Sequence, residues 1–139
     1  MNTYTFEQLS VGMTESFSIT VTEKMLSAFQ ETTGDINPLH TSSDFAVMRG
    51  YQDRVVYGML TASFLSTLAG VYLPGENSLI HSVETSFTQA VYVGDKLQVT
   101  GKVVEMSDTV VNRIVLKVTI TNQNSEKVLR GKMTIGVLK

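Results

Sequence analysis

The sequence predicts an α+β fold in which an antiparallel β-sheet curls around one long, buried helix. The first observation is a run of apolar and small residues over positions 58–73, followed directly by Pro74 and Gly75. Such side chains occur nearly all round the expected helix, as they do in helices that are buried on every side. The second observation is that the chain after Ser78 alternates apolar and polar residues, which is typical of strands with one buried face.

Local patterns predict the elements that precede this helix. Residues 15–22 alternate and indicate a first strand, whose inward side chains are Phe17, Ile19 and Val21. Thr22 can cap a helix that ends near Gly34, because glycine adopts a positive φ easily. Ser42 or Ser43 can then cap a second, shorter helix.

Three later segments alternate clearly enough to predict which side chains face inward. They cover residues 96–106, 112–123 and 127–138, and turn residues precede or separate them at Gly94-Asp95 and Asn124-Ser125. The expected inward residues are Leu97, Val99, Gly101 and Val103 in the first segment, Ile114, Leu116, Val118 and Ile120 in the second, and Leu129, Met133, Ile135 and Val137 in the third.

Length and composition restrict the class of protein. A chain of 139 residues indicates one domain, residues 1–139, that can enclose a core. The net charge of −2 gives no basic field, so neither nucleic acid nor an anionic membrane is an expected partner. With no cysteine and only two histidines, we expect no metal site. No signal peptide or membrane span is visible, and a cytoplasmic location is expected.

The segment TTGDINPLH, residues 32–40, is the best candidate for chemistry. Asp35 and His40 lie five residues apart in what is expected to be an irregular loop. Pro38 fixes its own φ and makes Asn37 extended, so the loop is stiff. A stiff loop can hold an acid and an imidazole about 3 Å from one water molecule, as proton transfer requires. The residues alone leave a second interpretation open, in which the loop is only a turn with polar side chains.

Gly58 is the second candidate, because it opens the predicted buried helix. The first N–H groups of a helix have no intrahelical acceptor and lie at the positive end of the helix dipole. They are suited to a developing oxyanion, such as the enolate of a thioester. The alternative is that glycine here only allows the chain to turn tightly into the helix.

The segment FQETTGDINPLHTSSDFA, residues 29–46, resembles the signature of the MaoC-like hydratases of the hot-dog superfamily, the (R)-specific enoyl-CoA hydratases in particular. That signature is an aromatic residue, then Gly-Asp-x-Asn-Pro-aliphatic-His, then Ala six residues after the His, and every defined position is filled. YGMLTASFLSTLAG resembles the family's central helix, and FTQAVYVGDKLQVTGKV resembles its first long hairpin. The resemblance covers most of the chain, and the helix and hairpin patterns are shared among hot-dog proteins generally.

The resemblance implies reversible syn hydration of trans-2-enoyl thioesters to (R)-3-hydroxyacyl thioesters. Asp35 and His40 would form the catalytic pair that activates water, and Gly58 would donate its N–H to the thioester carbonyl. Ser66 matches a position that helps to hold the active-site hydrogen bonds. A homodimer with substrate tunnels near its interface is implied. No metal or separate organic cofactor is implied, since coenzyme A or carrier-protein pantetheine would arrive within the substrate.

One position departs from the family's pattern, because Tyr57 stands where His is frequent, and this alters the pocket wall or the donor geometry. The central helix contains no Asp or Glu, which disfavours the hot-dog thioesterases and dehydratases that carry a carboxylate there. Two alternatives stay open. One is a 3-hydroxyacyl dehydratase that acts on a carrier-protein thioester, and the other is a non-catalytic module that binds acyl thioesters.

Overall fold

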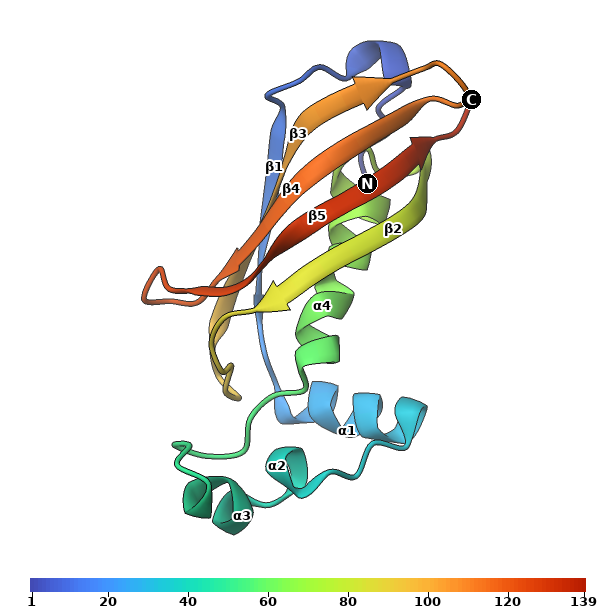
Figure 1. Ribbon diagram of the computed structural model, residues 1–139. Coiled ribbons are helices and arrows are strands. Elements are labelled where there is room, and N and C mark those ends of the chain that lie inside the picture. The colour runs from blue at the N-terminus through green and yellow to red at the C-terminus, as the bar shows by residue number, and fades with distance from the viewer.

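A five-stranded antiparallel sheet and a central helix form the architecture of the computed structural model, which describes residues 1–139. The sheet has the strand order β1-β3-β4-β5-β2. Its elements are η1 (Phe6–Gln8), β1 (Thr14–Thr20), α1 (Glu23–Thr33), α2 (Pro38–Thr41), α3 (Ser43–Met48), α4 (Gly58–Thr67), η2 (Leu68–Tyr72), β2 (Ser78–Phe87), β3 (Lys96–Ser107), β4 (Arg113–Thr121) and β5 (Lys127–Val137). The sheet curves around α4, which confirms the predicted α+β class and its hot-dog arrangement (Figure 1).

The three C-terminal strands have the predicted alternation. All of the expected inward residues of β3, β4 and β5 are buried, and Leu116 on β4 lies opposite Val103 on β3 and Met133 on β5. A Val or Leu side chain contributes roughly 1.5–3 kcal/mol when it is fully removed from water. The same alternation keeps the polar residues of these strands on the outer face, away from the helix.

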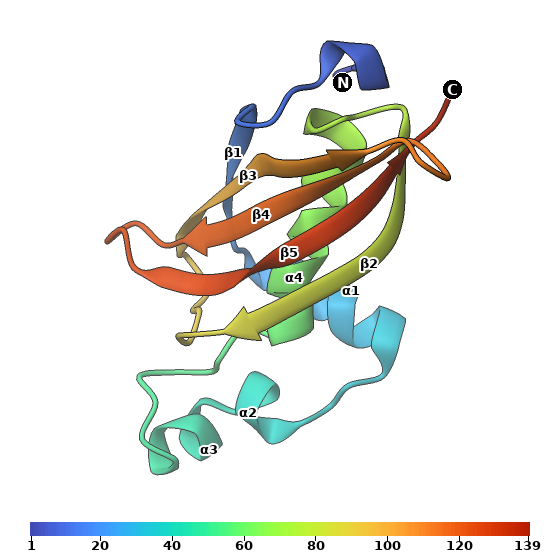
Figure 2. The same ribbon diagram turned by 45° about the horizontal axis from the view of Figure 1, so that its top comes forward.

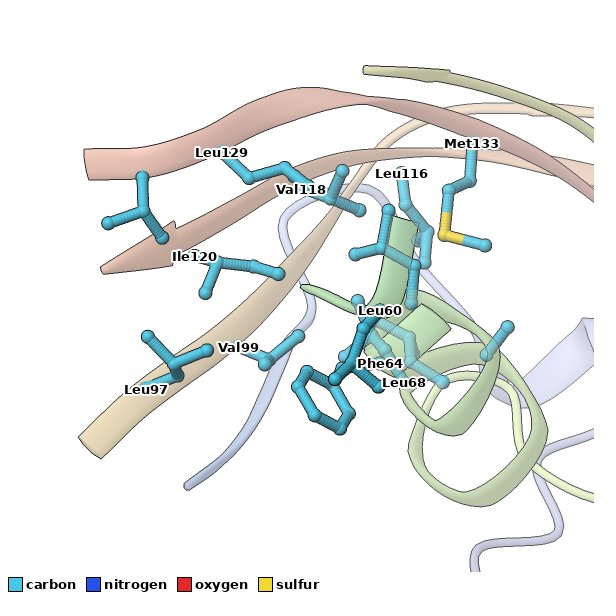
Figure 3. Close-up of a cluster of buried hydrophobic side chains, with 14 of the residues drawn as sticks. Leu60, Phe64, Leu68, Leu97, Val99, Leu116, Val118, Ile120, Leu129 and Met133 are labelled. Atoms are coloured by element: carbon cyan, nitrogen blue, oxygen red, sulfur yellow. The ribbon is translucent and has the colours of Figure 1, made fainter. Parts of the chain in front are cut away.

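The core lies between this sheet and one side of α4. Figure 3 shows Leu60, Phe64 and Leu68 pointing at the inner face of the sheet, where they meet the apolar side chains of β3, β4 and β5. A Cβ atom on Gly101 would lie 2.9 Å from the Leu68 side chain, so glycine on β3 allows the helix to approach the sheet closely.

The opposite face of α4 is exposed, and the prediction of a helix buried on every side is wrong for this face. Met59 is 66% exposed, and Ser63 and Ser66 are also exposed. When apolar and small residues occur on all sides of a helix, the sequence does not reveal which face the rest of the same chain covers. The helix continues into a π-helical turn, η2, which ends where the Leu73 N–H donates to Leu68 O at 2.8 Å. No helix here is long and apolar enough to cross a membrane.

The helices α1, α2 and α3 lie together beyond the end of the sheet, near the start of α4 (Figure 2). Thr22 caps α1 and accepts from the Met25 N–H, and Gly34 ends it with φ 74°, both as predicted. The expectation of an irregular loop up to His40 is wrong in part. Pro38 stands at the first position of a single helical turn, α2. Proline suits this position because its fixed φ is close to the helical value and the first N–H of a helix has no intrahelical acceptor.

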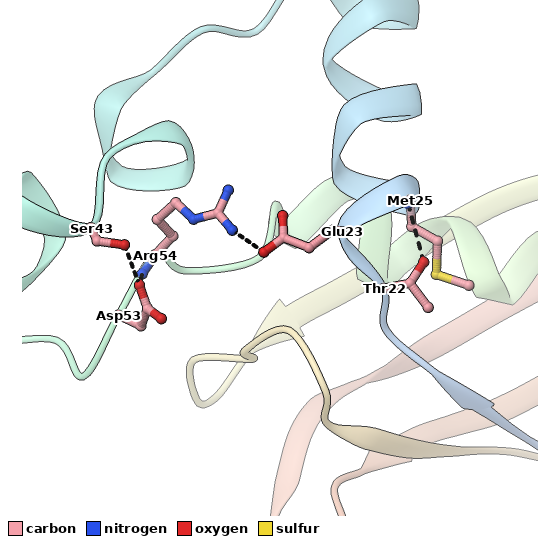
Figure 4. Close-up of polar contacts among 6 residues, drawn as sticks. All are labelled: Thr22, Glu23, Met25, Ser43, Asp53 and Arg54. Carbon is pink, nitrogen blue, oxygen red and sulfur yellow. Dashed lines mark hydrogen bonds and ion pairs between the residues drawn. The ribbon is translucent and has the colours of Figure 1, made fainter.

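Polar contacts fix these helices to the segment that leads into α4 (Figure 4). Arg54 forms an ion pair with Glu23 in the first turn of α1. Asp53 Oδ1 accepts hydrogen bonds from the Ser43 hydroxyl at 2.6 Å and from the Arg54 N–H at 2.7 Å. These contacts hold residues 53–57 against both α1 and α3.

Candidate active site

His40 is placed by the short helix α2. Asn37 caps the helix, because its side-chain oxygen accepts from the Leu39 N–H at 2.9 Å, and Pro38 begins it. The backbone of Asn37 is extended, with φ −54° and ψ 127°, as expected for a residue that precedes proline. Asn37 and Pro38 therefore fix the direction in which His40 leaves the turn.

The ring of His40 is oriented by a backbone carbonyl. Its Nδ1 atom lies 2.6 Å from Val55 O, and a carbonyl oxygen can only accept a hydrogen bond. Nδ1 therefore carries the proton in the neutral ring, and Nε2 keeps the lone pair. The Val55 N–H in turn donates to Leu39 O at 3.1 Å, so Val55 is attached to α2 through both Leu39 and His40.

Asp35 follows Gly34, the residue that ends α1 in the left-handed conformation. Its Oδ1 accepts from the Asn37 N–H at 3.0 Å, and its own N–H donates to Thr33 Oγ1 at 3.2 Å. Oδ2 has no hydrogen-bond partner within the chain, and the residue is exposed. One carboxylate oxygen is thus used to hold the turn and the other remains available.

Gly58 opens α4, and neither its N–H nor that of Met59 has an acceptor within the chain. The ring of Phe87, the last residue of β2, lies above this position. A Cβ atom on Gly58 would be 3.3 Å from Phe87 Cε1. The site thus offers two free donors at the positive end of a ten-residue helix.

Three of the predicted site residues line one cleft of about 490 Å³, although they come from three separate segments. Asp35, His40 and Gly58 reach it from the end of α1, from α2 and from the start of α4. The full lining is Phe29, Thr33, Asp35, His40, Tyr57, Gly58, Met59 and Phe87. The residues that carry an available carboxylate oxygen, an imidazole lone pair and free N–H donors therefore line a common space that is large enough for an acyl thioester's reactive end.

Tyr57 forms part of the wall of this cleft and is 2% exposed. Its hydroxyl donates to Asp35 O at 2.7 Å, and its ring lies 4.2 Å from the His40 ring, measured between centroids. Burial, and then the negative charge of Asp35, raise the pKa of Tyr57 above its ordinary value, so the phenol remains a donor at neutral pH. The sequence identified this residue only as a departure from a family pattern.

A second cleft, of about 310 Å³, adjoins the first. His40, Gly58 and Phe87 line both spaces, and Val56, Val91 and Val128 are among the apolar residues of the second. Thr61, one turn after Gly58, also lines it and is 1% exposed, and its hydroxyl has no hydrogen-bond partner. No sequence signal distinguishes Thr61 or Phe87 from ordinary core residues of a helix and a strand.

The structure does not bring Ser66 to the other candidates. It lies eight residues after Gly58, which is about 12 Å along a helix, and its side chain is on the exposed face of α4. It lines neither cleft of the single chain. Its assignment to the active-site hydrogen bonds stays a prediction.

Comparison with known proteins gives a consistent result. The family model described as the MaoC like domain matches residues 8–127. A 3-hydroxybutyryl-CoA dehydratase of Methylorubrum extorquens is 35% identical over 101 residues, which are 73% of this chain and 64% of that protein. An (R)-specific enoyl-CoA hydratase of Aeromonas caviae is 35% identical over 91 residues, or 66% of this chain and 68% of that one. The chain thus spans about two thirds of the length of these relatives.

A solved structure is similar over nearly the whole chain. The unliganded R-hydratase of Pseudomonas aeruginosa has a TM-score of 0.90 and 27% sequence identity, with 97% of this chain and 86% of that chain covered. The agreement includes the sheet, the central helix and the segment with α1, α2 and α3, because so little of this chain lies outside the match.

Proposed function

The chain belongs to the MaoC-like domain family, and we propose that it catalyses the reversible syn hydration of trans-2-enoyl thioesters to (R)-3-hydroxyacyl thioesters. The observation that supports this most directly is the cleft that Asp35, His40 and Gly58 share. It combines a base, a carboxylate and oxyanion donors, which are the groups that addition of water to an activated double bond requires.

In the proposed reaction His40 is the base. Its Nε2 lone pair takes a proton from water as the water oxygen forms a bond to C3 of the enoyl group. The π electrons move towards the thioester, which becomes an enolate. Nε2 then gives its proton to C2, and the ring returns to the neutral form with Nδ1 still bonded to Val55 O. Oxygen and hydrogen reach the same face because one ring positions both.

Asp35 and Gly58 stabilise the charges that appear during this step. The free oxygen of the Asp35 carboxylate can accept the second O–H of the water and favours the imidazolium that forms on His40. The N–H of Gly58 donates to the enolate oxygen, and a donor of this kind contributes about 3 kcal/mol in other enzymes. Dehydration follows the same steps in reverse, so the net direction depends on the concentrations of the enoyl and 3-hydroxyacyl thioesters.

We further propose that two copies of the chain associate through β2. The substrate is the acyl thioester, and the reaction uses no additional cofactor. β2 is an edge strand, so its outer N–H and C=O groups are unpaired. Four apolar side chains on it are between 38% and 53% exposed, namely Leu79, Ile80, Val83 and Phe87. The exposed face of α4 lies on the same side of the sheet as Phe87, and Phe87 also lines the cleft. A second copy would cover the apolar side chains of β2 and the exposed face of α4 together.

The direct test uses crotonyl-CoA and follows the loss of the enoyl-thioester absorbance, with the stereochemistry of the product assigned by chiral chromatography. The proposal expects rapid loss and an (R)-3-hydroxybutyryl product. Binding without loss of absorbance, for crotonyl thioesters of both coenzyme A and a carrier protein, would indicate a non-catalytic module and contradict the proposal. An (S) product would contradict the assigned geometry.

A further inference from the structure

Tyr57 contacts both proposed catalytic residues and also adjoins the oxyanion donor. It immediately precedes Gly58 and is the N-cap residue of α4. Its hydroxyl is bonded to the backbone of Asp35, and its ring is tilted by 32° against the His40 ring. One buried residue thus links the three groups that would perform the chemistry.

The hydrogen bond to Asp35 is the only one that attaches residues 34–37 to a distant part of the chain. The other hydrogen bonds of this segment are local, between partners no more than four residues apart. All four residues are exposed, so no apolar packing holds them in place. Without the Tyr57 hydroxyl, the backbone of Asp35 would bond to water and the carboxylate would lose its fixed distance from His40.

The ring of Tyr57 is itself held rigidly. It packs between His40 and Phe29, whose ring centroid is 4.7 Å away, and it is almost completely buried. It is also joined through the backbone to α4, whose Leu60, Phe64 and Leu65 are buried in the core. A rigid donor of this kind can transmit the position of the helix to the exposed segment around Asp35.

We propose that Tyr57 is a positioning residue, which sets the distance from the Asp35 carboxylate to the His40 imidazole and fixes both relative to the Gly58 N–H. This inference rests on the proposed hydratase function. It assigns a role to a residue that touches no reacting atom and acts through Asp35 and His40. It also gives a function to the tyrosine at position 57, where His is frequent in the family.

The test is Tyr57→Phe, which removes the hydroxyl and keeps the ring that packs on His40. We expect kcat to fall about 10- to 100-fold, because a displacement near 1 Å can cost that much, while KM stays within about twofold. Hydrogen exchange should accelerate at residues 34–37 and not in α4. The thermal midpoint should change little, since the Asp35 carbonyl that loses its donor is on an exposed residue and can bond to water.

Tyr72→Phe is the matched control. Tyr72 is half-buried and, like Tyr57, packs on an aromatic ring, that of Phe17, with centroids 4.9 Å apart. It lies outside the cleft, and its hydroxyl has no partner in the chain. Its kcat should equal that of the unaltered protein. Near-normal kcat in Tyr57→Phe would overturn the positioning role and leave the hydratase assignment intact. An unaltered protein that turns over no enoyl thioester would overturn both.

Discussion

The Nδ1 atom of His40 lies 2.6 Å from the carbonyl oxygen of Val55. Val55 stands three residues before Gly58, so one short segment carries both the acceptor that fixes the His40 tautomer and the donor that faces the cleft. The Val56 N–H bonds to Val91 O at 2.8 Å and ties this segment to the loop after β2. The base and the oxyanion donor are therefore positioned by the same stretch of backbone.

Asp35→Asn should reduce kcat by about 10²- to 10⁴-fold, the usual contribution of a group that assists proton transfer. The amide oxygen can still accept from the Asn37 N–H, so the turn should persist and the thermal midpoint should move little. Steady-state kinetics with crotonyl-CoA measure the effect. Asp44→Asn, in the first turn of α3, is the control, and equal losses in the two variants would argue against a specific role for Asp35.

Gly58→Ala should lower activity in a chain that still folds. The position does not have a positive φ, so alanine can adopt the backbone conformation of this glycine. The added Cβ would be 3.3 Å from the Phe87 ring and would narrow the cleft beside the donor, so kcat/KM should fall roughly tenfold. Gly70→Ala, whose Cβ would meet only Ser78 Oγ at 3.9 Å, should leave kcat/KM unchanged.

Val83→Asp should prevent association through β2. Val83 lies opposite Met133 on the helix side of the sheet, near the free edge, and is 45% exposed. An inward-pointing charge on an edge strand opposes pairing with a second strand. Light scattering should show the mass of a single chain for this variant and twice that mass for Ser86→Asp, whose altered side chain is on the outer face. Dimers in both variants would exclude β2 as the interface.

Two carboxylates should make stability depend on acid pH. Hydrogen bonds from Ser43 and then from the Arg54 backbone lower the pKa of Asp53 below its ordinary 3.8, and those from Gln89 and Asn122 lower the pKa of Glu126 below 4.5. A carboxylate whose pKa is lower in the folded state stabilises the protein above its unfolded pKa. That contribution disappears as the pH falls through the folded value.

Asp53→Asn and Glu126→Gln should therefore be less stable than the unaltered protein near neutral pH, and the difference should shrink as the pH falls through about 4. Urea unfolding at several pH values measures it. Asp108→Asn is the control, because Asp108 makes no hydrogen bond or ion pair in the chain. A difference that grows towards acid pH would contradict the sign of these pKa shifts.

The strands and helix ends were predictable because their signals are local. Every residue that the alternation in β3, β4 and β5 placed on the inner face is buried, and Thr22 and Gly34 marked the ends of α1. The helix α2 was missed because four residues are too few for a periodic pattern. The exposed face of α4 was missed because small and apolar residues suit a core and an interface equally well.

The sequence predicted the residues of the site that belong to recognisable local patterns, and it did not predict the contacts that position them. Asp35 and His40 share a segment, and Gly58 has a helix-start pattern, but the contacts that hold them do not appear in a sequence. The carbonyl of Val55 is 15 residues from His40, and the Tyr57 hydroxyl reaches a carbonyl 22 residues away. Any residue has a carbonyl group, so its use as an anchor is decided by the fold alone.

The most direct measurement is the rate of crotonyl-CoA hydration by His40→Ala beside the unaltered protein and His81→Ala. His81, the only other histidine, lies on β2 and lines neither cleft near α4. Hydration by the unaltered protein and His81→Ala, with kcat lowered about 10²- to 10⁴-fold in a folded His40→Ala, is the predicted result. Near-normal turnover by His40→Ala would contradict the role assigned to this imidazole.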